Sequence, residues 1–97
     1  LKNSYNSNNE IIQLDASPNP FENNTNIKFN NDNTILSIYN DMGELLLEKD
    51  FSNEKSGAYS FEWNGLDKNG TKLPAGAYLC KIQSNEEVNT IKIILIK

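Results

Sequence analysis

The chain has no histidine, no arginine and a single cysteine among its 97 residues. Without histidine it lacks the commonest general base and the commonest metal ligand of proteins. The lone cysteine, Cys80, cannot form an internal disulfide, and no imidazole is present to activate it as a nucleophile. We therefore expect a protein that is not an enzyme, with no metal site and no cofactor, whose function lies in surfaces that other molecules recognise.

The charges and the apolar runs exclude two further classes. Thirteen acidic residues stand against nine basic ones, a net charge of -4, and every basic residue is a lysine. Nucleic-acid binding normally depends on basic stripes that contain arginine, so no nucleic-acid partner is expected. No apolar run reaches the roughly 18 residues that a membrane-spanning helix needs, so we predict no transmembrane segment. The chain begins without a methionine or a signal-peptide pattern, which indicates a piece of a longer polypeptide.

What the sequence does contain is a regular alternation of short apolar runs and turn residues. No window carries a helical repeat of apolar residues over three turns. Seven runs have the length and residue types of β-strands: residues 11–16, 25–30, 34–40, 44–51, 57–63, 76–83 and 86–97. We expect an all-β fold, a seven-stranded antiparallel immunoglobulin-like β-sandwich, although the Cys-Trp-Cys spacing of antibody domains is absent. The polar, asparagine-rich residues 1–10 are predicted to be a flexible linker.

Alternation with a period of two predicts the core. Tyr59, Phe61 and Trp63 form a stripe of aromatic side chains on one face of their run, and we expect them at the centre of the core. Other sets that share one face of a run are Thr25, Ile27 and Phe29, then Leu36 and Ile38, then Tyr78, Cys80 and Ile82, of which Leu36, Ile38 and Cys80 are expected inside.

The last run is apolar on both faces. Ile91, Ile93 and Leu95 lie on one face, and Ile94 and Ile96 lie on the other. One face of an antiparallel sheet normally meets solvent. This strand is therefore either covered on both faces or awaits a partner.

The longest turn region reads WNGLDKNGTKLPAGAY, over residues 63–78. Its glycines and asparagines accept positive φ angles, so we predict two reversals, at residues 64–70 and 74–76. Asp67 and Asn69 fit the role of turn formers. The alternative is a weak calcium site in this loop, but Tyr78 stands where an EF-hand loop would need its final glutamate.

Three motifs follow one another in a fixed order. SPNPF occupies residues 17–21, IYNDMGELL residues 38–46, and WNGLDKNGTKLPAGAYLCKI residues 63–82, before the apolar ending IKIILIK. In this combination they resemble the type A C-terminal sorting domain of the type IX (Por) secretion system of Bacteroidota, over residues 11–97. The third motif is also similar to one in the immunoglobulin-like domain of the flagellar hook-capping protein, which is the nearest competing family.

The resemblance to sorting domains implies a cleavable secretion signal. Such a domain directs the cargo protein fused upstream of it through the type IX translocon, with the help of an outer-membrane shuttle protein. A sortase-like cysteine peptidase then removes the domain. The implied location is the periplasm in transit, and then the cell surface or the medium into which the protein is secreted.

The same resemblance assigns residues to two steps. Cleavage is placed among Asn3, Ser4, Tyr5, Asn6, Ser7, Asn8, Asn9 and Glu10. Translocon recognition is placed at Gly43, Gly65, Gly70, Gly76, Lys92, Ile94, Leu95, Ile96 and Lys97.

Two alternatives come from other functional classes. A structural or adhesive immunoglobulin-like spacer, of the hook-capping kind, would persist in the mature protein instead of being cleaved. A carbohydrate-binding module would expose a flat row of aromatic side chains, and Tyr5, Tyr39 and Tyr59 are the candidates for such a row.

Overall fold

Seven strands build the part of the chain that the structure describes. The computed structural model describes residues 14–85 and 87–96. The strands are β1 (Asp15–Ser17), β2 (Thr25–Asn31), β3 (Ile35–Tyr39), β4 (Leu45–Asp50), β5 (Gly57–Trp63), β6 (Gly76–Gln83) and β7 (Val88–Leu95). Within this part of the chain no helix is long and apolar enough to cross a membrane.

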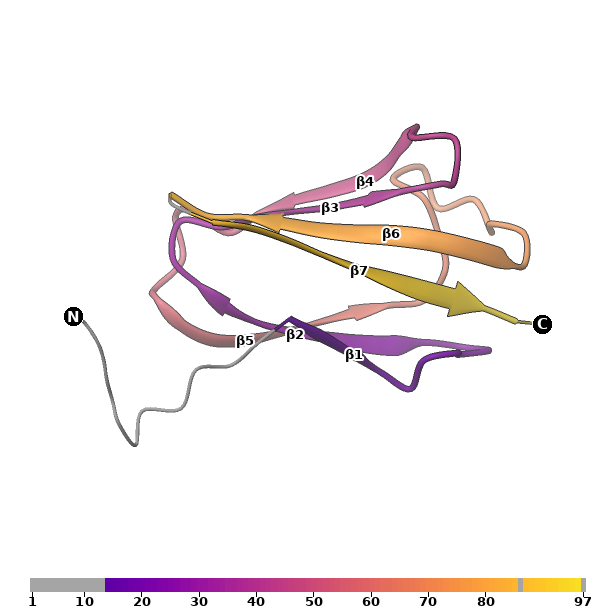
Figure 1. Cartoon of the computed structure of the whole chain (residues 1–97), viewed down its shortest axis with the longest axis horizontal. Coiled ribbons are helices and arrows are strands. Elements are labelled where there is room, and N and C mark those ends of the chain that lie inside the picture. Colours follow the sequence, from indigo (N-terminus) through magenta and orange to yellow (C-terminus); the bar gives the residue numbers. More distant parts are fainter. Residues whose placement is uncertain (1–13, 86, 97) are drawn as a thin grey trace.

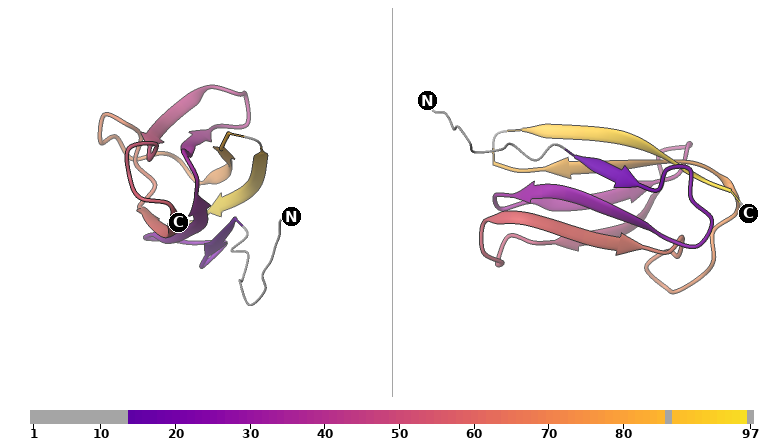
Figure 2. Two further views of the ribbon diagram at one scale, coloured as in Figure 1. Left: turned by 90° about the vertical axis from the view of Figure 1, so that its left-hand side faces the viewer. Right: turned by 90° about the horizontal axis from the view of Figure 1, so that it is seen from below.

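The strands form two sheets that pack face to face. One sheet has the order β1-β2-β5 and the other the order β4-β3-β6-β7, and all neighbouring strands run antiparallel. Figure 1 shows the two sheets as separate layers, and Figure 2 shows them end-on and from below. Connections after β2, β4 and β5 cross from one sheet to the other. The predicted all-β sandwich with seven antiparallel strands is confirmed.

The core lies between the facing sides of the two sheets. Alternate side chains of each strand point into it, because successive residues of a strand face opposite ways. The apolar side chains with no exposed surface are Ile27, Phe29, Leu36, Ile38, Cys80 and Ile93. The predicted inward positions of Leu36, Ile38 and Cys80 are therefore confirmed, and the shared face of Ile27 and Phe29 on β2 is also buried.

The aromatic stripe of β5 lies differently from its prediction. Trp63 is buried, but Tyr59 and Phe61 are only half-buried. The reason is that β5 is an edge strand of its sheet, so a neighbouring strand covers one side only. Phe51, from the connection after β4, packs against both rings with centroids 5.7 and 6.4 Å away. The prediction that the whole stripe forms the centre of the core is wrong for Tyr59 and Phe61.

The structure describes residues 14–16 of the predicted run of residues 11–16, and β1 contains the last two of them. Leu14 is not in a strand, and β1 ends at Ser17, directly before Pro18. Proline has no N–H to donate to a ladder, so this end agrees with the prediction. Residues 1–13 lie outside the described residues, and with them the predicted linker and cleavage region.

A buried asparagine closes the end of the sandwich where β2 turns into β3. Asn31 Nδ2 donates to the carbonyl oxygens of Phe51 and Lys55, at 3.0 Å each, and Asn31 Oδ1 accepts the N–H of Thr34 at 3.1 Å. The N–H of Phe51 in turn donates to the carbonyl oxygen of Thr34 at 2.8 Å. These bonds fasten the turn after β2 to the connection after β4.

Cys80 gives this fold a defined response to alkaline pH. Burial raises the pKa of the Cys80 thiol from 9.0 to about 12. Between these values the thiol ionises in the unfolded chain and stays protonated in the folded one, so the free energy of unfolding falls as the pH rises. The pKa of Tyr78 is raised as well, first by burial and second by the negative charge of Asp41, and its contribution has the same sign.

We therefore expect the melting temperature to drop as the pH rises through the interval from about 9 to about 12. The drop should be shallower in Cys80→Ala, because this variant lacks the titrating thiol. Thermal unfolding followed by circular dichroism at closely spaced pH values measures both slopes, with each protein normalised to its own value at neutral pH. Equal slopes for the two proteins would contradict the role of the thiol.

Candidate functional site

The three sequence motifs meet at one end of the sandwich. SPNPF follows β1, IYNDMGELL contains the turn from β3 to β4, and the long third motif connects β5 to β6. All three connections lie at the end where β7 finishes, as Figure 1 and the right-hand view of Figure 2 show. We call this region the motif end, defined as residues 17–21, 40–44, 64–76 and 92–96.

After β1 the chain changes sheets at the motif end. β1 pairs with β2, whereas Phe21 forms a parallel bridge with Leu95 of β7, in the other sheet. Pro18 and Pro20 lie between the two pairings and suit such a crossover, because neither ring nitrogen can donate to a ladder. The SPNPF motif is therefore the point where the two sheets are joined along one edge.

Four hydrogen bonds hold this crossover against the end of β7. Phe21 N–H donates to the carbonyl oxygen of Ile94 at 2.9 Å, and Ile96 N–H donates to the carbonyl oxygen of Phe21 at 2.8 Å. The Asn19 side chain adds a pair: Nδ2 donates to the carbonyl oxygen of Lys92, and Oδ1 accepts the N–H of Ile94, both at 2.9 Å. We call this arrangement of residues 19–21 on residues 92–96 the clasp.

Side chains from the first and third motifs pack beneath the clasp. The Phe21 and Trp63 rings lie 5.4 Å apart between centroids, and the Trp63 and Tyr78 rings lie 5.6 Å apart. Gly65 packs so closely that a Cβ at its position would lie 3.3 Å from Cδ2 of Leu95. The motif end is thus a packed extension of the core and not a loose group of loops.

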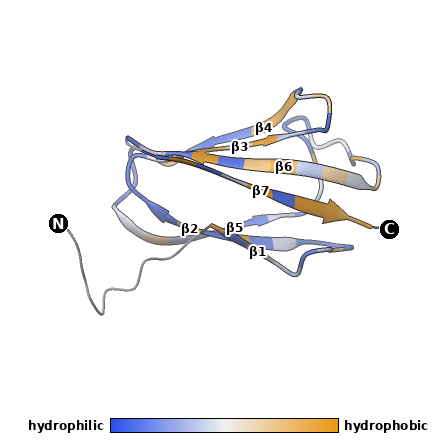
Figure 3. Cartoon of the chain, in the orientation of Figure 1, coloured by the Kyte–Doolittle hydropathy of each residue, from blue (hydrophilic) through white to orange (hydrophobic). Residues whose placement is uncertain are grey.

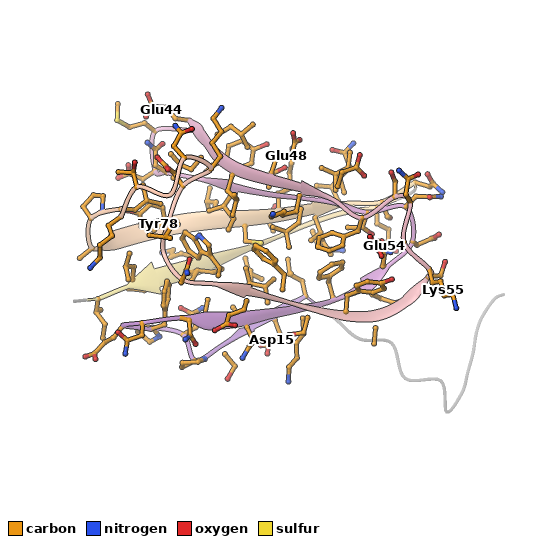
Figure 4. All side chains as sticks on the ribbon, turned by 180° about the vertical axis from the view of Figure 1, so that it is seen from behind. Asp15, Glu44, Glu48, Glu54, Lys55 and Tyr78 are labelled. Atoms are coloured by element: carbon orange, nitrogen blue, oxygen red, sulfur yellow. The ribbon has the colours of Figure 1, made fainter. Side chains whose placement is uncertain are left out.

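Trp63 and Tyr78 each carry a polar group on the ring, and a hydrogen bond from this group to a backbone carbonyl orients each ring. Trp63 Nε1 donates to the carbonyl oxygen of Leu66 at 3.0 Å, and the Tyr78 hydroxyl donates to the carbonyl oxygen of Pro74. Figure 4 shows Tyr78 pointing from β6 into the space between the sheets. Both acceptors belong to the connection after β5, so the rings that anchor this connection in the core also fix its path.

The turn from β3 to β4 is organised by Asn40. Its Oδ1 accepts the N–H groups of Met42 and Glu44, both at 2.9 Å, and its backbone carbonyl accepts the N–H of Gly43 at 3.1 Å. Gly43 has φ +86, a conformation that glycine adopts without steric cost. The turn thus places Gly43 at a positive φ, and Gly43 is exposed.

Asp67 forms the tight turn of the third motif. Its Oδ1 accepts the N–H of Asn69 at 2.9 Å and the N–H of Thr71 at 3.0 Å, and its backbone carbonyl accepts the N–H of Gly70 at 3.0 Å. This is the turn-forming role predicted from the sequence. In residues 14–85 and 87–96 no group of three or more acidic or thiol side chains is placed to hold a metal ion, so the described loop offers the calcium alternative no support.

The residues assigned to recognition lie together at the motif end but differ in exposure. The exposed ones are Gly43, Gly70, Gly76, Lys92 and Ile96, while Ile94 is half-buried. Gly65 and Leu95 are buried, so they act on a partner only through the packing of their neighbours. Lys97 and the cleavage segment, residues 3–10, lie outside the described residues.

An apolar patch lies on the outer face of the four-stranded sheet. Of its residues, only Ile94 was among those that the resemblance assigned to recognition. The cross-strand partners Leu45, Tyr39 and Leu79 form one row of it, and Ala77 beside Ile94 forms the next. Leu45 and Leu79 are 45% and 40% exposed. We call these five residues the outer patch. Figure 3 shows that apolar residues also gather in the second half of β7.

The sequence contains a signal for the outer patch, because apolar residues interrupt the alternation in β6 and β7. Leu79 interrupts the alternation of β6, because it stands between the buried residues Tyr78 and Cys80. Alternation therefore sends it to the outer face, where a polar residue is normal. The same argument applies to Ile94 between Ile93 and Leu95.

One known family matches most of this chain. The family model of the FlgD Ig-like domain matches residues 9–87. This chain belongs to the FlgD Ig-like domain family. The match takes in β1 to β6 and stops directly before β7, which begins at Val88. A comparison with curated proteins finds no significant match to this FlgD Ig-like domain.

Two solved structures have regions similar to this FlgD Ig-like domain. One is PorZ of Porphyromonas gingivalis, an essential bacterial surface component of the type-IX secretion system, with a TM-score of 0.70 and 18% sequence identity over 87% of this chain and 11% of PorZ. The other is dimeric latent PorU of the same organism, with a TM-score of 0.62 and 21% identity over 86% of this chain and 9% of PorU. The domain thus spans about a tenth of either protein, and the likeness establishes a shared fold.

Gly65 and Gly43 provide a matched test of the packing at the motif end. Both have positive φ, at +76 and +86, so alanine at either site carries backbone strain of about 1 to 2 kcal/mol. Only at Gly65 would the new methyl group meet the buried Leu95 side chain. We expect Gly65→Ala to lower the free energy of unfolding in urea clearly more than Gly43→Ala does. Equal losses would mean that Leu95 moves aside freely.

Asn19 provides a test of the clasp itself. Asn19→Ala removes two hydrogen bonds to β7 and should lower the free energy of unfolding by about 1 to 2 kcal/mol. It should also speed amide hydrogen exchange at Ile94, whose N–H loses its acceptor. The control is Asn23→Ala, because Asn23 is exposed and forms no side-chain hydrogen bond within the described residues. Unchanged exchange at Ile94 would show that the clasp does not depend on the Asn19 side chain.

Proposed function

We propose that this FlgD Ig-like domain is a C-terminal sorting domain of the type IX secretion system. In this proposal it directs a cargo protein fused upstream of it out of the periplasm, to the cell surface or the medium. The observation that carries the proposal is that all three motifs of that resemblance come together at the motif end, where SPNPF is bonded to β7 and Gly65 of the third motif packs on Leu95. The likeness to PorZ, a surface component of this secretion system, supports it.

The proposed partners are the type IX translocon, the outer-membrane shuttle protein and the sortase-like cysteine peptidase. Exposed backbone at Gly43, Gly70 and Gly76 permits close approach of a partner, because these positions have no side chain. Ile96, which is 42% exposed just after β7, offers an apolar contact at the tip. The peptidase would supply the cleavage chemistry, so the domain itself needs no catalytic residue, metal or cofactor.

A second candidate function is a structural or adhesive spacer. The observation that favours it is the family match itself, since the FlgD Ig-like model takes in residues 9–87 and leaves out the final strand. A spacer would need β7 to complete the core, through Ile93 and Leu95, but not as a contact surface for a partner. The two candidates differ in one measurable respect, because a spacer remains attached to the mature extracellular protein and a sorting domain is removed.

Export of a fusion protein tests the sorting function. We expect a periplasmic reporter fused to residues 1–97 to reach the medium or the cell surface in a bacterium with an active type IX system. Ile96→Glu should lower the amount exported about tenfold or more, because a carboxylate would have to be buried in an apolar contact. A point substitution is sharper than deletion of the last five residues, which would remove Ile93 and Leu95 from the core.

The controls separate loss of recognition from loss of folding. Ala58→Glu introduces the same charge at an exposed position of β5, away from the motif end, and should leave export unchanged. Equal melting temperatures of the purified domains exclude unfolding as the cause. If the unaltered fusion stays periplasmic while a known sorting domain exports the same reporter, the sorting function is wrong. Intact-mass analysis that finds the domain still attached outside the cell would favour the spacer.

A further inference from the structure

One half of the outer edge of β7 has no pairing partner among the residues that the structure describes. β7 is the last strand of its sheet, and the clasp binds it only from the carbonyl group of Lys92 onward. Ile94 directs both its N–H and its carbonyl group to the clasp, so by alternation Val88 and Thr90 direct theirs to the same side. In residues 14–85 and 87–96 nothing pairs with these groups or with the N–H of Lys92.

The crossover at SPNPF explains why the clasp stops where it does. Before Pro18 the chain belongs to the other sheet, where Asp15, Ala16 and Ser17 pair with β2. Of the described residues before β2, Asn19 and Phe21 bond to β7, and they lie beside its final part. The first part of the edge, from Val88 to Lys92, therefore presents a row of backbone donors and acceptors of the kind that an added strand binds.

Two lysines lie on the outer face near this open edge, although the whole chain has a net negative charge. On the outer face, Thr90 is paired with Lys81 of β6, and Lys92 is paired with Leu79. Neither β6 nor β7 contributes an acidic side chain to this face. Of the acids near it, Glu44 and Glu48 belong to β4 and its turn, as Figure 4 shows, and Glu87 directly precedes Val88. Against a net charge of -4, this half of the face carries two lysines.

We propose that the edge of β7 from Val88 to Lys92 binds an extended acidic segment of another protein as an additional strand. Backbone hydrogen bonds to Val88, Thr90 and Lys92 would give the affinity, and a carboxylate beside Lys92 would give the preference for an acidic sequence. Val88, 56% exposed, offers an apolar contact at the start of the strand.

A second copy of the domain fits this edge less well than an acidic segment does. Its own β7 would bring Val88, Thr90 and Lys92 to the shared face and no carboxylate. Two paired copies would also place the Lys81 and Lys92 side chains of both on one continuous face, and like charges across a strand pair are unfavourable. The inference does not depend on the proposed sorting function, because pairing along Val88, Thr90 and Lys92 is measured on the purified chain without export.

Titration of the full chain with a synthetic peptide tests the inference. The probe is a capped nine-residue peptide with glutamate at every second position and threonine or valine between. The control peptide has lysine in place of each glutamate. We expect saturable binding of the acidic peptide alone, weakened by added salt. At saturation, amide exchange of Val88, Thr90 and Lys92 should slow by about tenfold or more, as it does on entry into a hydrogen-bonded ladder.

Three variants locate the binding on the edge. Lys92→Glu should weaken binding about tenfold, whereas Lys28→Glu, the same change on the exposed face of the other sheet, should leave it nearly unchanged. Thr90→Pro removes the central outward N–H and should abolish binding, while Thr90→Ala keeps that N–H and should retain it. If Thr90→Pro fails to fold, Lys92→Glu and the exchange data still decide whether the peptide binds along the edge of β7.

Several outcomes would overturn the inference. Equal binding of both peptides, or chemical-shift changes that map away from β7, would rule out an acidic strand at this edge. Slow exchange of Val88 and Thr90 in the free protein would mean that the edge is already covered. Gel filtration would then tell a second copy from the residues before Leu14 of the same chain as the cover. If any of these results appeared, the test of export at the motif end would still stand on its own.

Discussion

The pairing of Phe21 with the end of β7 joins the two sheets of this domain by backbone hydrogen bonds, and the motif end is built around it. Elsewhere the sheets meet through side chains, whose packing tolerates small shifts. Here N–H and carbonyl groups of one segment fix the position of the other, and the Asn19 side chain extends the pairing by one residue pair. Trp63, Gly65 and Tyr78 then pack beneath a frame that is already set.

The sequence predicted the strands well because each is bounded by residues with a clear conformational preference. Prolines end β1, and Gly43 and Gly70 occupy turns with positive φ. Alternation also placed the inward side chains of β2, β3 and β6. It failed for Tyr59 and Phe61, because the period of a strand tells which face a side chain takes but not whether another strand covers that face. Strand order is a tertiary property, and β5 turned out to be an edge.

The candidate site was predictable in its membership but not in its arrangement. Nothing in SPNPF or in IKIILIK indicates that the two segments touch, since they lie 73 to 75 residues apart in the chain. The resemblance listed Gly65 and Leu95 beside exposed residues, and only the structure separates those that face solvent from those that support them. The outer patch was not predicted as a surface, because its sequence signal on β6 is a single residue, Leu79, out of phase with its strand.

The clasp also sets the order in which this domain can be completed. Its two halves come from nearly opposite ends of the described chain, so the bonds between them form only when the final strand is present. A chain still being made, or cut short before Lys92, can form hairpins such as β3 with β4 but cannot close this edge. The sandwich therefore closes only after synthesis has passed β7.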